Sequence, residues 1–154
     1  WNCLSPSATS IKKSFLIENN ILFNESPEFT IVEDYDFWLS LAKNGAVFEF
    51  IDKTLGNYVV DGENIYGNWH RYINNLENLY EHHAFNVQNF EPVKNKIYKK
   101  LIAKIHFLRF KKALKEKKTL VAFKEIIQTL CKYPTLLLSE IVSFASAKTG
   151  NRLN

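Results

Sequence analysis

The chain has 154 residues, 46% of them hydrophobic and 14% aromatic, so it can bury a core and belongs with globular rather than disordered proteins. No apolar run reaches the roughly 18 residues that a membrane span needs, and no signal peptide is visible. Cys3 and Cys131 stand alone in the sequence. Their isolation argues against a disulfide framework or a zinc–thiolate site and favours a reducing compartment.

The formal net charge of +4 conceals two halves of opposite sign. Residues 1–91 hold 5 Lys/Arg against 13 Asp/Glu, a net −8, whereas residues 92–154 hold 15 against 3, a net +12. This asymmetry predicts an acidic segment that holds a metal or acts as a base, and a basic segment that faces an anionic partner.

The first quarter of the chain alternates short predicted elements. Small and β-branched residues at 7–11 predict a strand, and residues 12–19 predict a short helix with Phe15 and Leu16 facing inward. Residues 24–28, which include a proline, predict a loop.

Three carboxylates, Glu33, Asp34 and Asp36, then fall within four residues at the start of a helical pattern. The helix is expected to begin near Asp34 as its N-cap and to end at Gly45 in the left-handed conformation. One interpretation is that the acids only complement the helix N-terminus, worth ~1 kcal/mol. The other interpretation is that the acids have a catalytic role. Glu33 adds a charge that capping does not require, and the apolar residues 29–32 predict a short extended segment, so the acids lie where a strand leads into a helix. The apolar positions of this helix are Phe37, Trp38, Leu41 and Ala42.

Two further strands are expected at residues 46–51 and 54–60, followed by a polar loop. A long helix then begins at about Asn68. Its neighbouring His82 and His83 point about 100° apart on a helix, so they cannot chelate one ion and are expected to be surface or partly buried residues.

The last third predicts basic helices over residues 95–118, 120–131 and 136–147. Three interpretations of the many lysines remain open: an anionic membrane surface, for which residues 94–118 are the candidate; a solvated face packed on a neighbouring domain; and nucleic acid, which the absence of any nucleic-acid motif disfavours. The apolar stripes along the first two of these helices are Ile97, Leu101, Ile105 and Leu108, and Leu120, Phe123, Ile127 and Leu130.

Four ordered pieces of the chain resemble the C-terminal half of family-2 glycosyltransferases of the GT-A fold. They are SATSIKKSFL at residues 7–16, ILFNE at 21–25, EDYDFWL at 33–39, and the segment from Gly45 through residues 57–60 (NYVV). The resemblance covers roughly residues 5–65. It implies an α/β fold, the C-terminal part of a GT-A domain with a few strands followed by a basic helical tail. The corresponding domains are 1–66 for the acceptor side of the catalytic domain, 67–91 for a connecting amphipathic helix and 92–154 for the tail.

The resemblance also implies an activity, namely inverting transfer of a sugar from a nucleotide-sugar to an acceptor hydroxyl in cell-surface polysaccharide or lipopolysaccharide synthesis. Asp34 corresponds to the general base, and Glu33 is the second catalytic candidate. Asp36 and Trp38 are candidates for substrate binding, although Trp38 also suits the core. Asp61 stands where the family has a histidine and is the candidate metal ligand.

The same resemblance places the donor-binding half, with its D-x-D motif, ahead of Trp1, so the chain is expected to be inactive by itself. The complete enzyme would use a divalent cation, Mn²⁺ or Mg²⁺, and a glycan or lipid-linked acceptor, in the cytoplasm or on the inner face of the membrane. An isolated half-sheet would expose strand edges, so a homo-oligomer is also possible. The alternative class is a non-catalytic helical module that docks on a membrane surface or a partner protein.

Overall fold

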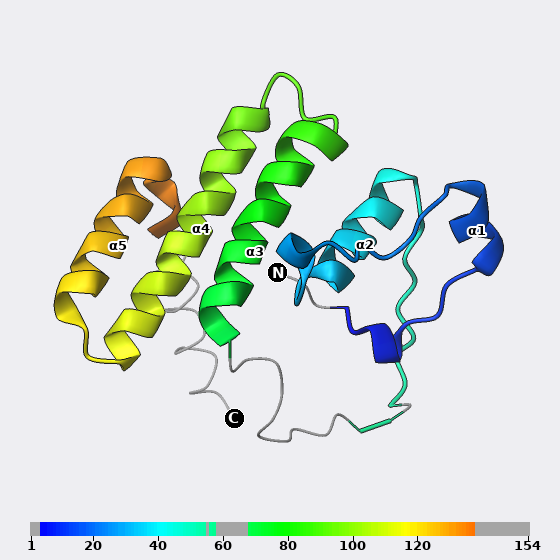
Figure 1. The fold of residues 1–154 in the computed structure, drawn as a ribbon, viewed down its shortest axis with the longest axis horizontal. Helices are drawn as coiled ribbons and strands as arrows, with labels where there is room; N and C mark the ends of the chain where they lie inside the picture. Colours follow the sequence, from blue (N-terminus) through cyan, green and yellow to red (C-terminus); the bar gives the residue numbers. More distant parts are fainter. Residues whose placement is uncertain (1–3, 55, 58–67, 138–154) are drawn as a thin grey trace. The chain divides into compact units, whose positions relative to one another are not determined.

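The computed structural model describes residues 4–54, 56–57 and 68–137. The chain divides into two compact units, the first ending at residue 88 and the second beginning at residue 89. The first unit contains the one-turn helix η1 (Pro6–Ala8), α1 (Lys13–Glu18), the one-turn helix η2 (Pro27–Phe29), α2 (Glu33–Lys43), α3 (Trp69–His82) and the π-helical turn η4 (His83–Val87). The second contains α4 (Lys94–Lys115) and α5 (Thr119–Lys132) (Figure 1). Helix α3, expected to connect two domains, therefore belongs to the first unit.

The expected α/β fold is wrong, because the described residues contain helices and no strand or sheet. Residues 46–51 have no regular secondary structure, and the expected strand at 7–11 is replaced in part by η1. A segment of alternating hydrophobicity forms a strand only when a neighbouring strand supplies hydrogen bonds and when its apolar face is packed against the core. Here Val47 is 94% and Phe50 86% exposed, so neither face of this segment is covered. Of the second expected strand, residues 55 and 58–60 lie outside the described residues.

The helices follow the sequence closely. Helix α1 turns Phe15 and Leu16 toward a cluster of Ile21, Phe37, Trp38 and Leu41, as its spacing predicts. Helix α2 begins two residues earlier than expected, with Val32 rather than Asp34 as its N-cap.

The C-terminus of α2 has the predicted left-handed glycine. Gly45 has φ +82, its amide donates to the carbonyl of Ala42, and the amide of Ala46 donates to that of Leu41. These two bonds form a Schellman motif, which stops the helix and satisfies its last carbonyls.

Helices α2 and α3 also meet through aromatic side chains. The rings of Tyr35 and Tyr80 lie 6.3 Å apart, edge to face. Burial of Tyr80, followed by the nearby phenols of Tyr35 and Tyr72, raises the pKa of Tyr80 far above its ordinary value of 10.0.

This raised pKa predicts alkaline destabilisation. Because folding keeps the Tyr80 phenol protonated, its contribution to stability is complete below pH 10.0 and is lost as the pH rises above that value. Urea unfolding at several alkaline pH values is expected to show a loss of stability that Tyr80→Phe reduces. An equal alkaline loss in the variant would contradict the assignment to Tyr80.

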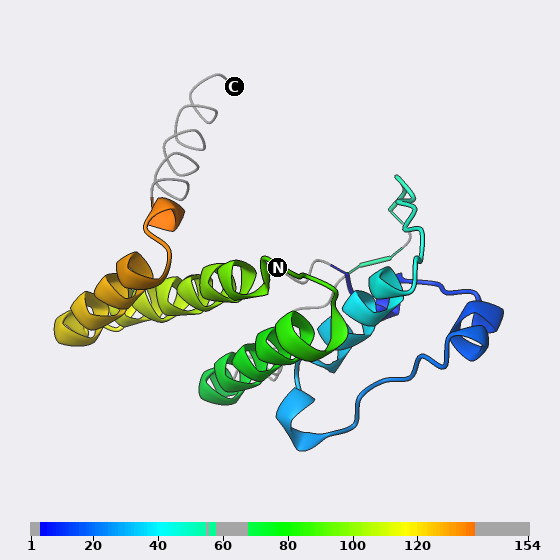
Figure 2. The same ribbon diagram turned by 90° about the horizontal axis from the view of Figure 1, so that it is seen from above.

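In the second unit, α4 and α5 run antiparallel and side by side (Figures 1 and 2). Helix α5 turns Ala122 and Thr129 inward, and His106 Nδ1 lies 2.6 Å from Glu125 Oε2 across the pair. These small residues on the buried face of α5 let it approach α4 closely. The larger apolar side chains of α5 lie on its other faces. Within the described part of the chain, no helix is both long and apolar enough to cross a bilayer.

Candidate functional site

The candidate site begins at a strained turn between η2 and α2. Thr30 has φ −51 and ψ 136, Ile31 has φ +76, and the amide of Val32 donates to the carbonyl of Phe29 at 2.9 Å. These values define a type II β-turn whose third position usually needs glycine or asparagine. A β-branched residue there costs on the order of 1–3 kcal/mol, so the surrounding structure must hold the turn in place.

Helix α3 supplies that support. Asn75 Nδ2 donates to the carbonyl of Thr30 at 2.8 Å and to that of Pro27 at 3.2 Å, and Arg71 Nη2 lies 3.1 Å from Thr30 Oγ1. Asn75 is itself buried. Two residues of α3 therefore fix the main chain that leads into Glu33.

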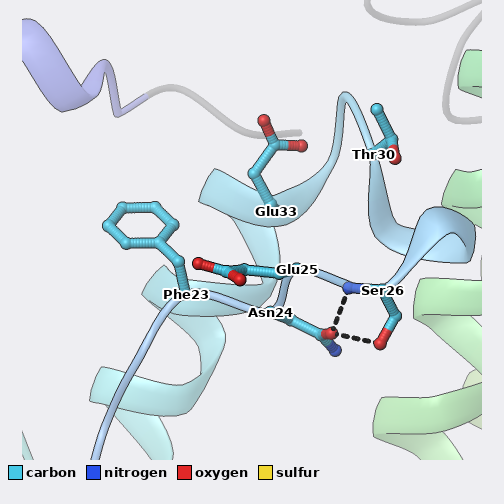
Figure 3. A pocket seen from close by; sticks show the side chains of 6 residues that line it. All are labelled: Phe23, Asn24, Glu25, Ser26, Thr30 and Glu33. Atoms are coloured by element: carbon cyan, nitrogen blue, oxygen red, sulfur yellow. Dashed lines mark hydrogen bonds between the residues drawn. The ribbon is translucent and has the colours of Figure 1, made fainter.

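A cavity of about 410 Å³ lies beside this turn (Figure 3). Its walls carry one aromatic ring, two carboxylates, one amide and two hydroxyls. Asn24 Oδ1 accepts hydrogen bonds from the amide of Ser26 at 3.1 Å and from its hydroxyl at 2.7 Å, which fixes one wall. The ring of Phe23 stacks on Phe37 at 4.2 Å, so the aromatic wall is anchored to the core. The lining residues are Phe23, Asn24, Glu25, Ser26, Thr30 and Glu33.

Glu33 is one of the residues that line this cavity, and its carboxylate is unusual in its hydrogen bonding. Its Oε2 atom is buried and accepts no hydrogen bond from the described residues. A buried polar atom without a partner costs about 1–3 kcal/mol, and more when it belongs to a charged group. The carboxylate points away from Phe23, Asn24, Glu25 and Ser26 (Figure 3), so a ligand in the cavity would reach Oε2 only after the Glu33 side chain rotates.

Asp34, the expected base, follows Glu33 in the first turn of α2 but does not line the cavity. Its Oδ1 accepts a hydrogen bond from the amide of Tyr35 at 2.7 Å. Both carboxylates lie in the first turn of α2, at the positive end of its dipole.

Asp36 points to the interior rather than to the cavity. Its Oδ1 lies 2.8 Å from His83 Nε2, and both side chains are buried. Gln88 Nε2 lies 3.2 Å from His83 Nδ1 and donates to the carbonyl of Leu39 at 3.3 Å. Because Nδ1 faces a donor, the proton is assigned to Nε2, which donates to Asp36. This chain of contacts ties α2 to η4.

Trp38 lies in the core, and its indole N–H donates to the carbonyl of Leu4 at 3.3 Å. Asp61, the expected metal ligand, lies outside the described residues. Within residues 4–54, 56–57 and 68–137, no three His, Cys, Asp or Glu side chains are grouped so as to hold a metal ion.

Sequence reasoning singled out Glu33, Asp34 and Asp36 but not the residues that contact Asp36 and the turn before α2. His83 is the first residue of η4 and continues the apolar spacing of α3, so its position already indicated burial, and a buried imidazole needs a polar partner. Asn75 carried a similar signal as a polar residue beside buried Leu76. No sequence signal indicated the cavity wall at Phe23, Asn24 and Ser26.

Comparison with known proteins adds no relative: no family model, curated protein or solved structure matches this chain. The chain's class therefore rests on its own geometry, a helical fold with an acid-lined cavity at the N-terminus of α2.

Proposed function

We propose that this chain supplies the acceptor site of an enzyme that transfers a sugar from a nucleotide-sugar to a hydroxyl group with inversion. The observation that carries the proposal is a cavity of about 410 Å³ whose lining includes the two acids Glu25 and Glu33. That volume falls in the range of about 300–1,000 Å³ typical of small-molecule sites. Polysaccharide or lipopolysaccharide synthesis is the setting that the sequence resemblance suggests.

The lining of the cavity favours a polyhydroxylated ligand. Sugar hydroxyls donate to carboxylates, and Glu33 and Glu25 provide such acceptors at two places. Ser26 and Thr30 add hydroxyls that both donate and accept. Phe23 gives the site one apolar ring, against which the C–H face of a sugar packs.

The proposed chemistry assigns separate roles to the two neighbouring acids. Glu33 accepts a hydrogen bond from the acceptor sugar and holds it in place. Asp34 takes the proton from the attacking hydroxyl, whose oxygen bonds to the anomeric carbon as the bond to the nucleotide diphosphate breaks and the electron pair leaves with the diphosphate. A general base of this kind must be ionised at neutral pH, which a position in the first helical turn favours.

Glu33→Gln tests the acceptor role. Transfer from a panel of nucleotide-sugars, measured with the complete gene product, is expected to show at least a tenfold rise in acceptor KM, with a smaller change in kcat. Glutamine keeps one acceptor oxygen but loses the charge that strengthens the hydrogen bond. The matched control is Glu28→Gln, because Glu28 is exposed on η2 and does not line the cavity.

Either of two results would overturn the assignment of Glu33. An unchanged KM in the Glu33 variant would remove its role in binding. An equal rise in the Glu28 variant would show that the effect is general electrostatics rather than contact.

The second candidate is a non-catalytic module that docks through its basic unit. The observation that favours it is the charge of the described part of the second unit, residues 89–137, which hold 13 Lys/Arg against 3 acidic residues. Absence of transfer by the complete gene product with every nucleotide-sugar would make this the better assignment.

A further inference from the structure

The turn between α4 and α5 carries an apolar surface that is open to solvent. We call residues 111–124 the hairpin tip. Within it Leu120 is 86% and Phe123 66% exposed, and Leu114 and Val121 are exposed as well. Single exposed apolar residues are ordinary, but four of them around one connection between two helices indicate an interaction site.

Lysines surround this apolar surface. The hairpin tip holds one acid, Glu116, which pairs with Lys118 at 2.7 Å and with Lys112 at 3.6 Å. The hydrogen bond from Lys118 is the main cause that lowers the pKa of Glu116, so its carboxylate is already matched by these lysines. Six lysines against this one acid give the tip a formal charge of +5. The exposed lysines of the tip are Lys111, Lys115, Lys117, Lys118 and Lys124.

The packing of α5 explains why its apolar stripe faces outward. Ala122 and Thr129 are buried, and Glu125 contacts His106 of α4. At 100° per residue, Leu120 and Phe123 project more than 90° away from these inward positions. Ile127 and Leu130 extend the same exposed stripe toward the end of α5.

We propose that the hairpin tip docks on the anionic surface of a lipid bilayer. In this arrangement Leu120 and Phe123 enter the boundary between headgroups and acyl chains, and the surrounding lysines contact lipid phosphates. Helices with Leu and Phe on one face and lysines around it bind membrane interfaces by combining these two contributions. The proposal is independent of the sugar-transfer proposal, because it uses neither the cavity nor Glu33.

Charge and exposed apolar area together favour a lipid surface over other partners. A nucleic acid would pair with the lysines but would leave Leu120 and Phe123 in water. A second copy of the chain would cover the apolar side chains but would bring two tips of charge +5 together. An anionic bilayer supplies both the negative surface and an apolar layer beneath it.

Vesicle co-sedimentation of the full chain tests the proposal. Binding is expected to vesicles of phosphatidylcholine that contain one third phosphatidylglycerol, and not to vesicles of phosphatidylcholine alone. Each lysine near an anionic surface strengthens binding about fivefold, so Lys117→Gln/Lys118→Gln/Lys124→Gln is expected to weaken it by about 100-fold. Leu120→Ser/Phe123→Ser is expected to weaken it by at least about tenfold.

Matched variants in the first unit provide the controls. Phe50 and Ile51 are 86% and 62% exposed, close to the values for Leu120 and Phe123, so Phe50→Ser/Ile51→Ser removes similar apolar surface. The control for charge is Lys12→Gln/Lys13→Gln/Lys43→Gln, because these three lysines are also exposed.

Four results would overturn the proposal. They are no binding to the anionic vesicles, equal binding to both kinds of vesicle, an equal loss in the control variants, and a change in oligomeric state in place of lipid binding when Leu120 and Phe123 are replaced. Light scattering on the same samples measures the oligomeric state. Circular dichroism of each variant verifies that the helices are intact.

Discussion

Asp34→Asn is expected to lower kcat for sugar transfer by about 10²–10⁴-fold and to leave the acceptor KM nearly unchanged. An amide of the same shape cannot take the proton from the attacking hydroxyl, so the chemical step slows while the acceptor still binds at Glu33. The measurement is steady-state transfer by the complete gene product, with the nucleotide-sugar that the wild-type protein uses.

The matched control is Asp52→Asn, which removes a carboxylate from an exposed position outside the candidate site. Loss of the Asp34 charge from the first helical turn costs only about 0.3–1 kcal/mol, so the variant is expected to remain folded. Retained activity in a folded Asp34 variant would show that Asp34 is not the base and only complements the N-terminus of α2. If Glu33→Gln instead showed the large fall in kcat, Glu33 would be the base.

His83→Ala is expected to produce the largest loss of stability, about 3–5 kcal/mol. The substitution removes the imidazole that faces Asp36 at 2.8 Å and leaves a buried carboxylate without this partner. Urea unfolding followed by tryptophan fluorescence is a suitable measurement, because all three tryptophans belong to the first unit. The signal therefore reports the unit that contains the contact between Asp36 and His83.

Two controls separate the buried charge from the loss of a side chain. Asp36→Asn keeps an oxygen that accepts from His83 Nε2, so its cost is expected to be only about 1 kcal/mol. His70→Ala removes an exposed imidazole from α3, the helix that precedes His83, and should change stability by less than about 0.5 kcal/mol. Similar losses in the three variants would show that the contact between Asp36 and His83 is not what matters.

The helices were predictable because their signals are local. Asn68 caps α3 by accepting from the amide of Arg71 at 3.2 Å, and Gly45 takes the left-handed conformation that ends α2. Both features depend on residues a few positions apart. The expected strand at 46–51 failed for the opposite reason, since its pattern of alternation required a partner strand that the described residues do not contain.

The candidate site was predictable only in part, for the same physical reason. Glu33 and Asp34 were apparent because adjacent carboxylates stand out in a sequence. The contacts of Asp36 with His83 and of Asn75 with Thr30 join residues 47 and 45 positions apart, and no local pattern specifies them. Asp36 was accordingly expected to bind substrate, whereas its carboxylate is directed to His83 in the interior.

The two hydrogen bonds from Asn75 to the turn also bear on the order of folding. They span 48 and 45 residues and support the strained conformation at Ile31, which locally has the hydrogen bond from the amide of Val32 to the carbonyl of Phe29. Contacts of such separation form only after the intervening chain has been ordered, at a cost in loop-closure entropy. During synthesis, residues 23–33 would therefore emerge from the ribosome well before their cavity can form, and the acidic site would be completed only once α3 has been translated and docked.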